Sequence, residues 1–326
     1  MTSALRAAGA RTFTALAAMP PSVADYREPR PGDDRFVTVT ARRPVAEYAF
    51  GSVASRMVDI RRDVQVSGLV TGAETIVGVP HVTGVRLASG ETVPAALVVD
   101  AMGRRSRLPD WLGGSGPGDR SRSTRTWASP TTPGSTARSR HRHRCCAPGC
   151  SHRSGPCPLS RCRVMCRPGS ITIIVSSRDK QLKRLREADR WTRVVAACPR
   201  HAHWLDGEPI TEVLPMAGIV DRYRRFVVDG TPVVTGVVTV GDSWACTNPS
   251  LGRGIALGLM HAVATSEAVR DHFDDPAALA FAHDNVTETQ LTPWFRQTLE
   301  FNRAQFARDA RSTPRPTRGE LLELMA

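Results

Sequence analysis

The sequence predicts an α/β fold, and two strand–turn–helix signals carry that prediction. Residues 237–262, VVTVGDSWACTNPSLGRGIALGLMHA, combine a Val-rich buried strand, a polar turn and a helix. Residues 85–112 hold a short hairpin and then an apolar strand at 95–99, which runs into a glycine turn. Helical periodicity over 178–198 and 276–310 adds helices to these strands. A layered domain built around buried strands is therefore expected.

The turn within 237–262 has the composition of a ligand site. Gly241 and Asp242 end the strand, and Gly252 and Gly254 flank the start of the helix. A carboxylate accepts hydrogen bonds from ligand hydroxyls, while a helix N-terminus offers free N–H groups and partial positive charge. Glycine lets the backbone approach a ligand closely. The alternative is an ordinary strand–turn–helix whose glycines serve packing.

This segment resembles the GD box of the p-hydroxybenzoate hydroxylase-like (group A) flavin monooxygenases, a superfamily that also holds geranylgeranyl reductases and flavin halogenases. The resemblance implies that FAD is the cofactor and that Asp242 holds its ribityl chain. It also implies that the helix start faces the pyrimidine edge of the flavin and favours the anionic reduced ring. The residues assigned to that helix start are Pro249, Gly252, Gly254 and Ile255.

A second segment resembles another flavin fingerprint of the same family. It runs from Asp100 through Met102 and Gly103 to Ser106. In the family, this strand end and glycine turn touch both FAD and the incoming nicotinamide cofactor. The family most often has aspartate directly before the glycine, and Met102 stands there in this chain, so NAD(P)H use is more in doubt than FAD binding. A solvated turn is the alternative for Ser106 and the adjacent arginines.

Two weaker matches extend the resemblance. Pro44 suits the first turn of a helix beginning near Arg43, and the family places an arginine at the start of such a helix, near the FAD pyrophosphate. Residues 64–69 alternate as a strand does. The resemblance implies that a backbone group of Val66 in this strand touches adenine.

The glycine-rich phosphate loop of a complete relative is missing. A complete member begins with a strand, GxGxxG and a helix, and this sequence contains no GxGxxG. Residues 1–22 look like a helix from well inside a full-length relative, so the chain is expected to be truncated at its N-terminus. A signal peptide is the alternative, but Arg6 and Arg11 interrupt the apolar run. No run has the length of a membrane span, so a cytoplasmic protein is expected.

Residues 115–170 differ in composition from the rest of the chain. The formal net charge is +13, and this segment holds eleven arginines and one acidic residue, Asp119. It also holds six of the eight cysteines and very few aliphatic side chains. A segment this poor in apolar side chains cannot offset its backbone entropy, about 1–2 kcal/mol per residue. We therefore expect 115–170 to be disordered.

Three origins compete for this segment. The cysteines, with His141, His143 and His152, suggest a zinc module, but no C-x-x-C pair is present. An arginine-rich arm for nucleic acid lacks the interleaved aromatic residues that such arms carry. We favour a frame-shifted translation of GC-rich coding DNA, which would also remove part of the substrate-domain sheet.

Order is expected to resume at residue 171. Residues 171–177 predict a strand, and 178–198 predict a helix with Leu182, Leu185, Val194 and Val195 on one side. Asp229-Gly230 predicts the turn of a hairpin within 223–240. The C-terminal helices are expected to bury Trp294, Phe295, Leu299 and Phe306.

Several polar side chains and thiols in this half have two interpretations. His201 and His203 fit a polar loop better than a substrate site. Solvated positions are preferred for Arg222, Arg224 and Arg225 over contact with cofactor or acidic substrate. Cys198 and Cys246 are expected to be buried thiols, and nothing suggests disulfides.

The resemblance thus implies an incomplete Rossmann-like FAD-binding domain, a partial β-sheet substrate domain and C-terminal helices. The expected function is an FAD-dependent, monooxygenase-like oxidoreductase acting on a small organic substrate, with NAD(P)H as reductant, impaired or inactive in this copy. The alternative is a non-catalytic flavoenzyme remnant or a basic-loop binding protein. No catalytic side chain, metal or specific nucleic acid is assigned, and the oligomeric state stays open. The expected divisions are a first FAD-binding segment (1–114), the disordered segment (115–170), the substrate-domain remnant (171–235), a second FAD-binding segment (236–275) and the C-terminal helices and tail (276–326).

Overall fold

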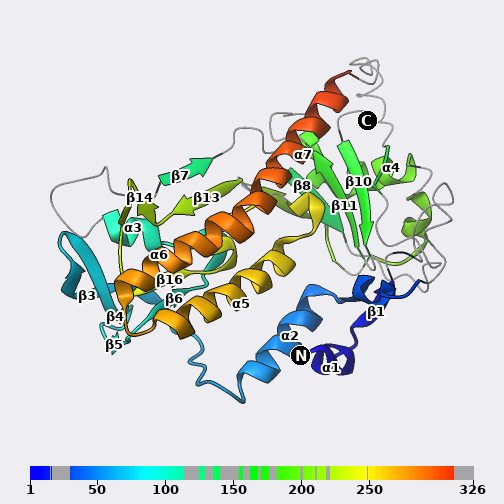
Figure 1. The fold of residues 1–326 in the computed structure, drawn as a ribbon. Coiled ribbons are helices and arrows are strands. Elements are labelled where there is room, and N and C mark those ends of the chain that lie inside the picture. The colour runs from blue at the N-terminus through cyan, green and yellow to red at the C-terminus, as the bar shows by residue number, and fades with distance from the viewer. Residues whose placement is uncertain are drawn as a thin grey trace.

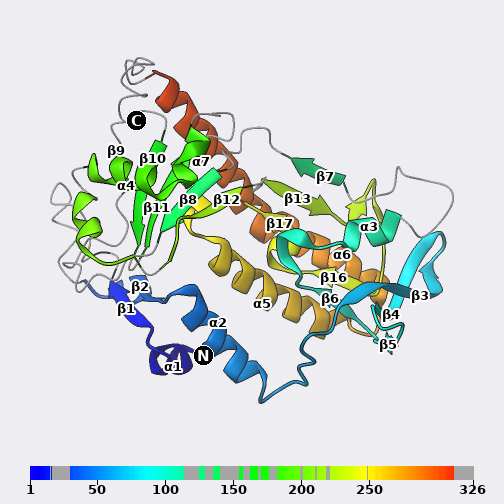
Figure 2. The same cartoon turned by 180° about the vertical axis from the view of Figure 1, so that it is seen from behind.

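The structure is a computed structural model that describes most of the chain. The described residues are 1–14, 16, 30–113, 125–128, 135–139, 154–156, 162–167, 170–175, 182–198, 201–209, 211–217, 221–247 and 249–311. One end of the molecule holds α5 and α6 against β6 and β16, and the other end holds a larger antiparallel sheet with α4 (Figures 1 and 2). The long helix α7 runs from the first end toward the second (Figure 1).

The elements follow one another in mixed order. The strands are β1 (Arg11–Thr14), β2 (Val37–Thr40), β3 (Val66–Ile76), β4 (Val79–Leu87), β5 (Thr92–Pro94), β6 (Val98–Asp100), β7 (Arg125–Ala128), β8 (Ser135–Ser139), β9 (Ser154–Pro156), β10 (Cys162–Arg167), β11 (Ser170–Val175), β12 (Leu214–Ala217), β13 (Arg222–Arg225), β14 (Val227–Val228), β15 (Thr231–Pro232), β16 (Val237–Thr239) and β17 (Ala245–Cys246). The α-helices are α1 (Thr2–Ala7), α2 (Arg43–Ala54), α3 (Leu108–Gly113), α4 (Ala188–Ala196), α5 (Gly254–His272), α6 (Pro276–Val286) and α7 (Thr292–Arg311). Short 3-10 turns are η3 (Asp33–Phe36), η4 (Gly103–Arg105), η5 (Leu182–Arg186), η6 (Ala202–Asp206), η7 (Gly241–Ser243) and η8 (Pro249–Leu251), and η9 (Thr287–Leu291) is a π-helical turn.

The parallel pair β6–β16 is the centre of the first end. Successive strand side chains point to opposite faces, and both faces of β16 are covered. On one face Val237 packs with Val82 and Leu108. On the other face Val238 packs with residues of α5 and α6. The apolar run predicted at 237–240 is therefore a strand buried on both faces, as expected for a parallel sheet.

The antiparallel sheet β3–β4–β5 leads into this centre. β3 and β4 form a long hairpin, and β5 pairs with β4. Residues 64–69 were predicted as a strand, and β3 confirms this from Val66 onward. The apolar strand predicted at 95–99 lies slightly later in the chain, as β6.

A hairpin turn precedes β16, as predicted. β14 and β15 pair antiparallel on either side of Asp229 and Gly230. Both turn residues have positive φ angles, 51° and 76°, which a two-residue hairpin of type I′ requires.

Four strands lie in the range 115–170, which was predicted to be disordered. They are β7, β8, β9 and β10; β11 begins at Ser170, and the other residues of that range, including His141, His143 and His152, lie outside the described residues, so disorder there stays a prediction. The sheet has the order β12–β8–β11–β10–β9. Its β11 buries Ile171 and Ile173 completely, and β8 and β10 pair with it on either side. Composition within 115–170 missed these strands because β7, β8 and β10 pair with β11, β12 or β13 from later in the chain, while β9 pairs with β10.

Helix predictions in the middle of the chain need one correction. The four apolar residues predicted on the inner side of the helix at 178–198 are buried. The single helix is instead a 3-10 turn, η5, followed by α4, and the break lies at Glu187, whose extended backbone precedes α4. Residues 176–181 and 199–200 lie outside the described residues.

The N-terminal prediction is also corrected. The expected helix over 1–22 ends at Ala7, and Gly9 with φ 96° turns the chain into β1, which pairs with β2. The helix predicted near Arg43 is confirmed as α2, with Pro44 in its first turn.

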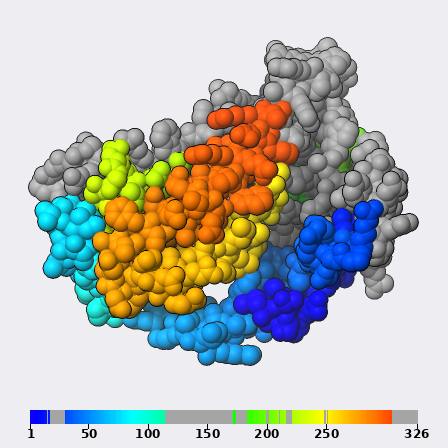
Figure 3. Space-filling view, viewed as in Figure 1, coloured from blue at the N-terminus to red at the C-terminus, as the bar shows by residue number. Residues whose placement is uncertain are grey.

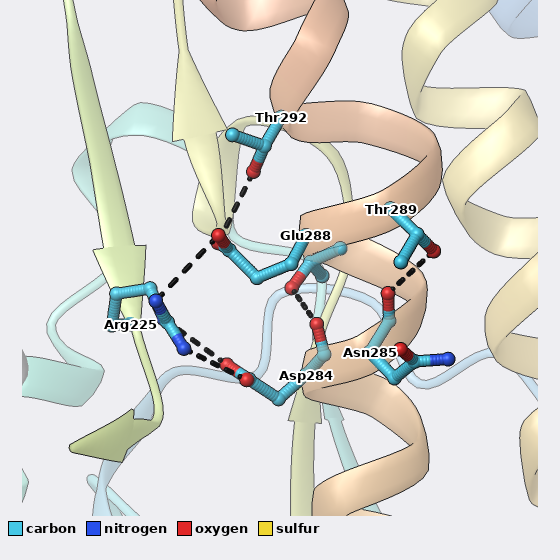
Figure 4. A network of polar contacts seen from close by, with 7 residues as sticks. Arg225, Asp284, Asn285, Glu288, Thr289 and Thr292 are labelled. Atoms are coloured by element: carbon cyan, nitrogen blue, oxygen red, sulfur yellow. Dashed lines mark hydrogen bonds and ion pairs between the residues drawn. The ribbon is translucent and has the colours of Figure 1, made fainter. Parts of the chain in front are cut away.

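A polar network holds the C-terminal helices to β13. The guanidinium of Arg225 binds Asp284 of α6 at 2.9 Å and Glu288 of η9 at 3.5 Å (Figure 4). Thr292, at the start of α7, donates to Glu288. Arg225 therefore links β13 to α6 and η9, and it is not the solvated residue that the sequence suggested.

The C-terminal helices share one face of the molecule. In the space-filling view α5, α6 and α7 lie side by side as a continuous surface (Figure 3). Phe295 of α7 is buried beneath it, but Trp294 is 40% exposed, and the Arg253 guanidinium lies over its ring, 5.3 Å from the centroid. Leu299 is half-buried, and the side chain of Phe306 lies outside the described residues. The predicted burial of these residues is therefore confirmed only in part.

Among the described residues, no helix is long and apolar enough to cross a bilayer.

Two glycines provide a test of this packing. A Cβ on Gly236 (φ 73°) would overlap the Val82 carbonyl oxygen and the His81 ring, whereas a Cβ on Gly51, inside α2, meets nothing within 4 Å. We expect Gly236→Ala to destabilise the protein by more than about 2 kcal/mol and Gly51→Ala to stabilise it by about 0.5–1 kcal/mol. Urea unfolding of both variants checks this, and equal effects would contradict the packing described.

Candidate functional site

Two chain turns meet beside the N-terminus of α5. The turn η4 follows β6, and the turn η7 follows β16, so the parallel pairing of these strands brings both turns to one edge of the sheet. Such edges, at the carboxyl ends of parallel strands, are where open α/β sheets bind ligands. The two fingerprints identified in the sequence are therefore adjacent in space.

A buried carboxylate joins the two turns. Asp100 is 4% exposed, and its Oδ1 accepts from the Met102 N–H at 2.9 Å and from the Ser243 hydroxyl at 3.1 Å. Its Oδ2 accepts from the Ser106 hydroxyl. Ser243 Oγ in turn accepts from the Gly103 N–H at 2.7 Å. Ser106 is thus a buried tie and not a solvated turn residue.

Arg224 completes this buried network. The residue is 2% exposed, and its guanidinium donates to the backbone carbonyls of Ser243 and Ser106. Burial lowers the pKa of Arg224 to about 10, and the nearby charge of Arg222 acts in the same direction, while the charge of Asp100 opposes them. The solvated position preferred for Arg224 is wrong, because the residue is buried, its guanidinium binds the two turn carbonyls, and the charge of Asp100 favours its charged form.

Asp242 lies differently from Asp100. It is exposed and lines an open pocket together with Trp244, Gly254, His261 and Phe295. The surrounding atoms of the pocket remove part of the water from the Asp242 carboxyl group and so raise its pKa, and the charges of three arginines oppose that shift. Its carboxylate is the polar group that a ligand entering this pocket would meet.

The three arginines that act on Asp242 come from separate elements: Arg43, Arg104 and Arg222. The guanidinium of Arg222 donates to the Arg104 carbonyl at 2.5 Å, which holds it beside the turn η4. Arg43 is exposed at the start of α2 and pairs with Glu47 at 2.6 Å. The surroundings of Asp242 are therefore net positive, and Arg104 is a residue that the sequence analysis did not assign.

The other residues predicted for the site are placed as follows. Gly254 is the first residue of α5 and lines the pocket, and no atom lies within 4 Å of a Cβ added there. Gly252 has φ 66°, which favours glycine. Pro249 begins η8, and Ile255 is 59% exposed on α5.

Val66 lies in the antiparallel sheet and not at this turn. It begins β3 and pairs with Leu87, and its residue is half-buried. Its predicted contact with adenine stays a prediction. His201 is buried and His203 stacks near Trp204, with ring centroids 5.9 Å apart, and neither lines the Asp242 pocket.

Two buried histidines support the turn η7 from below. The Gly241 N–H donates to His261 Nδ1 at 3.2 Å, and His283 Nε2 lies 2.9 Å from the Thr239 carbonyl oxygen. The two Nε2 atoms are 3.3 Å apart. Burial, with the neighbouring His283, lowers the pKa of His261 to about 3, and burial also lowers the pKa of His283. Both rings are therefore neutral near pH 7.

The thiol of Cys246 in this region is unreactive. Cys246 is buried, as predicted, and so is Cys198, which follows α4. Burial raises the pKa of Cys246 to about 11, so a thiolate is not populated near neutral pH. Among the described residues, no cluster of three His, Cys, Asp or Glu side chains could hold a metal ion.

The fold is an α/β Rossmann-like fold of the kind found in FAD-binding flavoproteins, which confirms the predicted fold class. Similar solved structures include the flavin-dependent halogenase CmlS, with TM-score 0.64 and 14% identity over 99% of this chain and 57% of that chain. The halogenase BrvH from Brevundimonas sp. BAL3 matches with TM-score 0.58 and 14% identity, again over 99% of this chain and 57% of that chain.

A third similar structure is PqsL, a probable FAD-dependent monooxygenase from Pseudomonas aeruginosa. It matches with TM-score 0.61 and 14% identity over 90% of this chain and 76% of that chain. The present chain spans little more than half the length of the two halogenases. No protein-family model and no curated protein matches the sequence.

The buried pair of His261 and His283 predicts that the free energy of unfolding falls at acid pH. Unfolding releases both rings to their ordinary pKa near 6.5, so the unfolded chain takes up protons that the folded chain excludes. The stability contributed by the neutral rings is complete above pH 6.5 and is lost as the pH falls toward 3. Between pH 7 and pH 5 we expect His261 alone to account for a loss of about 2 kcal/mol in the free energy of unfolding.

Urea unfolding at pH 7 and pH 5 measures this loss. His261→Asn should reduce the difference between the two pH values, while His203→Asn, at an exposed histidine, should leave it unchanged. Asp284 is the charged neighbour of His283 and opposes its shift, so it is kept in all variants. If His261→Asn loses as much free energy of unfolding between pH 7 and pH 5 as the parent does, the loss does not come from His261.

Proposed function

We propose that the Asp242 pocket binds FAD and that the chain is an FAD-dependent, monooxygenase-like oxidoreductase acting on a small organic substrate. One observation carries this proposal: an accessible carboxylate at a strand end shares a pocket with the glycine-flanked N-terminus of α5. The similar folds of FAD-dependent proteins support it. A cytoplasmic location belongs to the same proposal.

The residues present fit the ribityl and flavin ends of FAD. The Asp242 carboxylate offers acceptors for ribityl hydroxyls. At Gly254 the space that a Cβ would fill is open, so a planar ring can approach the N–H groups at the start of α5. The partial positive charge of that helix end favours a negatively charged ring by about 0.3–1 kcal/mol. We assign Pro249, Gly252, Gly254 and Ile255 to this contact.

The arginines fit the diphosphate of FAD. The sequence lacks GxGxxG, so another source of positive charge is needed for this dianion. The charges of Arg43, Arg104 and Arg222 all act on Asp242, and of the three Arg43 is also paired with a carboxylate, that of Glu47. Guanidinium groups bind phosphate oxygens through paired N–H donors.

The proposed division of the chain follows from these contacts. FAD is held by residues of 1–114 and 236–275, and the sheet around β11 forms the substrate side. Bound FAD would supply the redox chemistry, with NADH or NADPH as reductant. The chain itself would orient the cofactor and tune its charge. An inactive flavoenzyme remnant, or a protein that binds polyanions through its arginine-rich segment, is the alternative.

Titration of FAD against the purified chain, followed by flavin fluorescence, tests the proposal. We expect saturable binding that Asp242→Ala weakens about tenfold to hundredfold, because the ligand hydroxyls lose a charged acceptor. Asp271→Ala, at an exposed carboxylate near the end of α5, is the control and should bind as the parent does. Absence of FAD binding, with salt-sensitive binding of a polyanion, would instead support the alternative.

The arginine assignment has its own test. Arg104→Gln and Arg222→Gln should each weaken FAD about threefold to tenfold at low salt, and riboflavin, which lacks phosphate, should be unaffected. The neighbouring Arg105→Gln is the matched control, since Arg105 is not among the charges that act on Asp242. Equal losses for FAD and riboflavin would remove the diphosphate assignment.

A further inference from the structure

The turn that carries Asp242 has a backbone donor that its own sheet does not use. The Val240 N–H donates to the Asp100 carbonyl at 3.0 Å and so continues the pairing of β16 with β6. The next amide, that of Gly241, points instead toward α5 and donates to His261 Nδ1. A buried N–H needs an acceptor, and the carbonyls within a helix are already occupied by helical hydrogen bonds. A side chain of α5 must therefore provide it.

The acceptor is a ring held in one orientation. Trp244 packs edge-on against His261, with centroids 5.4 Å apart at 80°, and His283 stacks near it with centroids also 5.4 Å apart. His261 is 1% exposed, so the ring has no room to turn freely. Gly258, one turn earlier on α5, lies close to Gly241, and a Cβ added there would be in ordinary contact with the Gly241 Cα at 3.9 Å.

The backbone partner of His261 fixes the proton of its ring. A backbone N–H can only donate, so His261 Nδ1 carries no hydrogen and the neutral ring carries its hydrogen on Nε2. His261 Nε2 lies 3.3 Å from His283 Nε2, which itself lies 2.9 Å from the Thr239 carbonyl oxygen. In one tautomer His283 Nε2 accepts from His261, and in the other it donates to Thr239, so it makes one of these two hydrogen bonds at a time.

We infer that His261 is a positioning residue for the ligand site: it holds the Gly241 amide and thereby sets the direction in which the adjacent Asp242 carboxylate enters the pocket. This inference rests on the proposed binding of FAD. The His261 ring makes two separate contributions. Its volume fills space in the core and so supports stability, while its Nδ1 alone accepts the Gly241 N–H and so fixes the turn.

Two substitutions separate these contributions. His261→Asn places Oδ1 where Nδ1 was, so it keeps the acceptor but leaves a cavity. His261→Leu fills the volume but removes the acceptor. We expect Asn to lower the thermal midpoint more than Leu does. We expect the reverse order for the ligand, with the FAD dissociation constant within about twofold of the parent for Asn and raised about tenfold for Leu. Met260→Leu, on the exposed side of the same turn, is the control.

Hydrogen exchange of the Gly241 amide gives a readout that needs no ligand. The amide should stay protected in the parent and in His261→Asn and exchange faster in His261→Leu. An FAD affinity that simply follows thermal stability across the variants would overturn the inference, as would an unchanged exchange rate in His261→Leu. Failure of the parent to bind FAD, with the exchange pattern as expected, would instead overturn the proposed function and leave His261 as a support of the turn alone.

Discussion

The buried carboxylate of Asp100 is the constraint on which the site depends. It binds the Met102 amide and the hydroxyls of Ser106 and Ser243, and so it fixes one turn against the other. A carboxylate that is 4% exposed is costly unless its lone pairs are satisfied and a counter-charge is near, and Arg224 supplies that charge. Because this network spans residues 100–243, the two fingerprints can keep their geometry only when the parallel strands are in register.

The two aspartates of the site therefore have separate tasks. The Asp100 carboxylate is buried and its oxygens are occupied by hydrogen bonds within the protein, whereas the Asp242 carboxylate remains accessible in the pocket. The family resemblance places an aspartate directly before the glycine of the second fingerprint, where this chain has Met102, 45% exposed. The carboxylate nearest that position in sequence, Asp100, is turned inward. Any contact of this turn with a nicotinamide cofactor would thus come from its backbone or its arginines, and not from a carboxylate.

Local patterns in the sequence predicted those regions of the fold that local forces determine. The Val-rich strand at β16, the Asp229-Gly230 turn and Pro44 at the start of α2 each follow from periodicity or from φ preferences. Three of the strands within 115–170, β7, β8 and β10, were missed because they are paired with β11, β12 or β13, which follow them in the chain. Arg224 was misassigned for a related reason: its burial depends on carbonyls near residues 106 and 243, which no local pattern reveals.

Gly258 and His261 of α5 lie beneath the turn that carries Asp242. They show how more of the site could be predicted from the sequence. Gly258 and His261 are three apart, so they lie on one face of the helix, and both lie close to Gly241. An acceptor on this face is what a helix needs in order to pack under a turn whose amide points inward. The apolar stretch around them gives no local partner for a histidine, and burial keeps its ring neutral. A buried neutral histidine three residues after a glycine is thus explained by the turn above it, and the direction of Asp242 follows from the same contact.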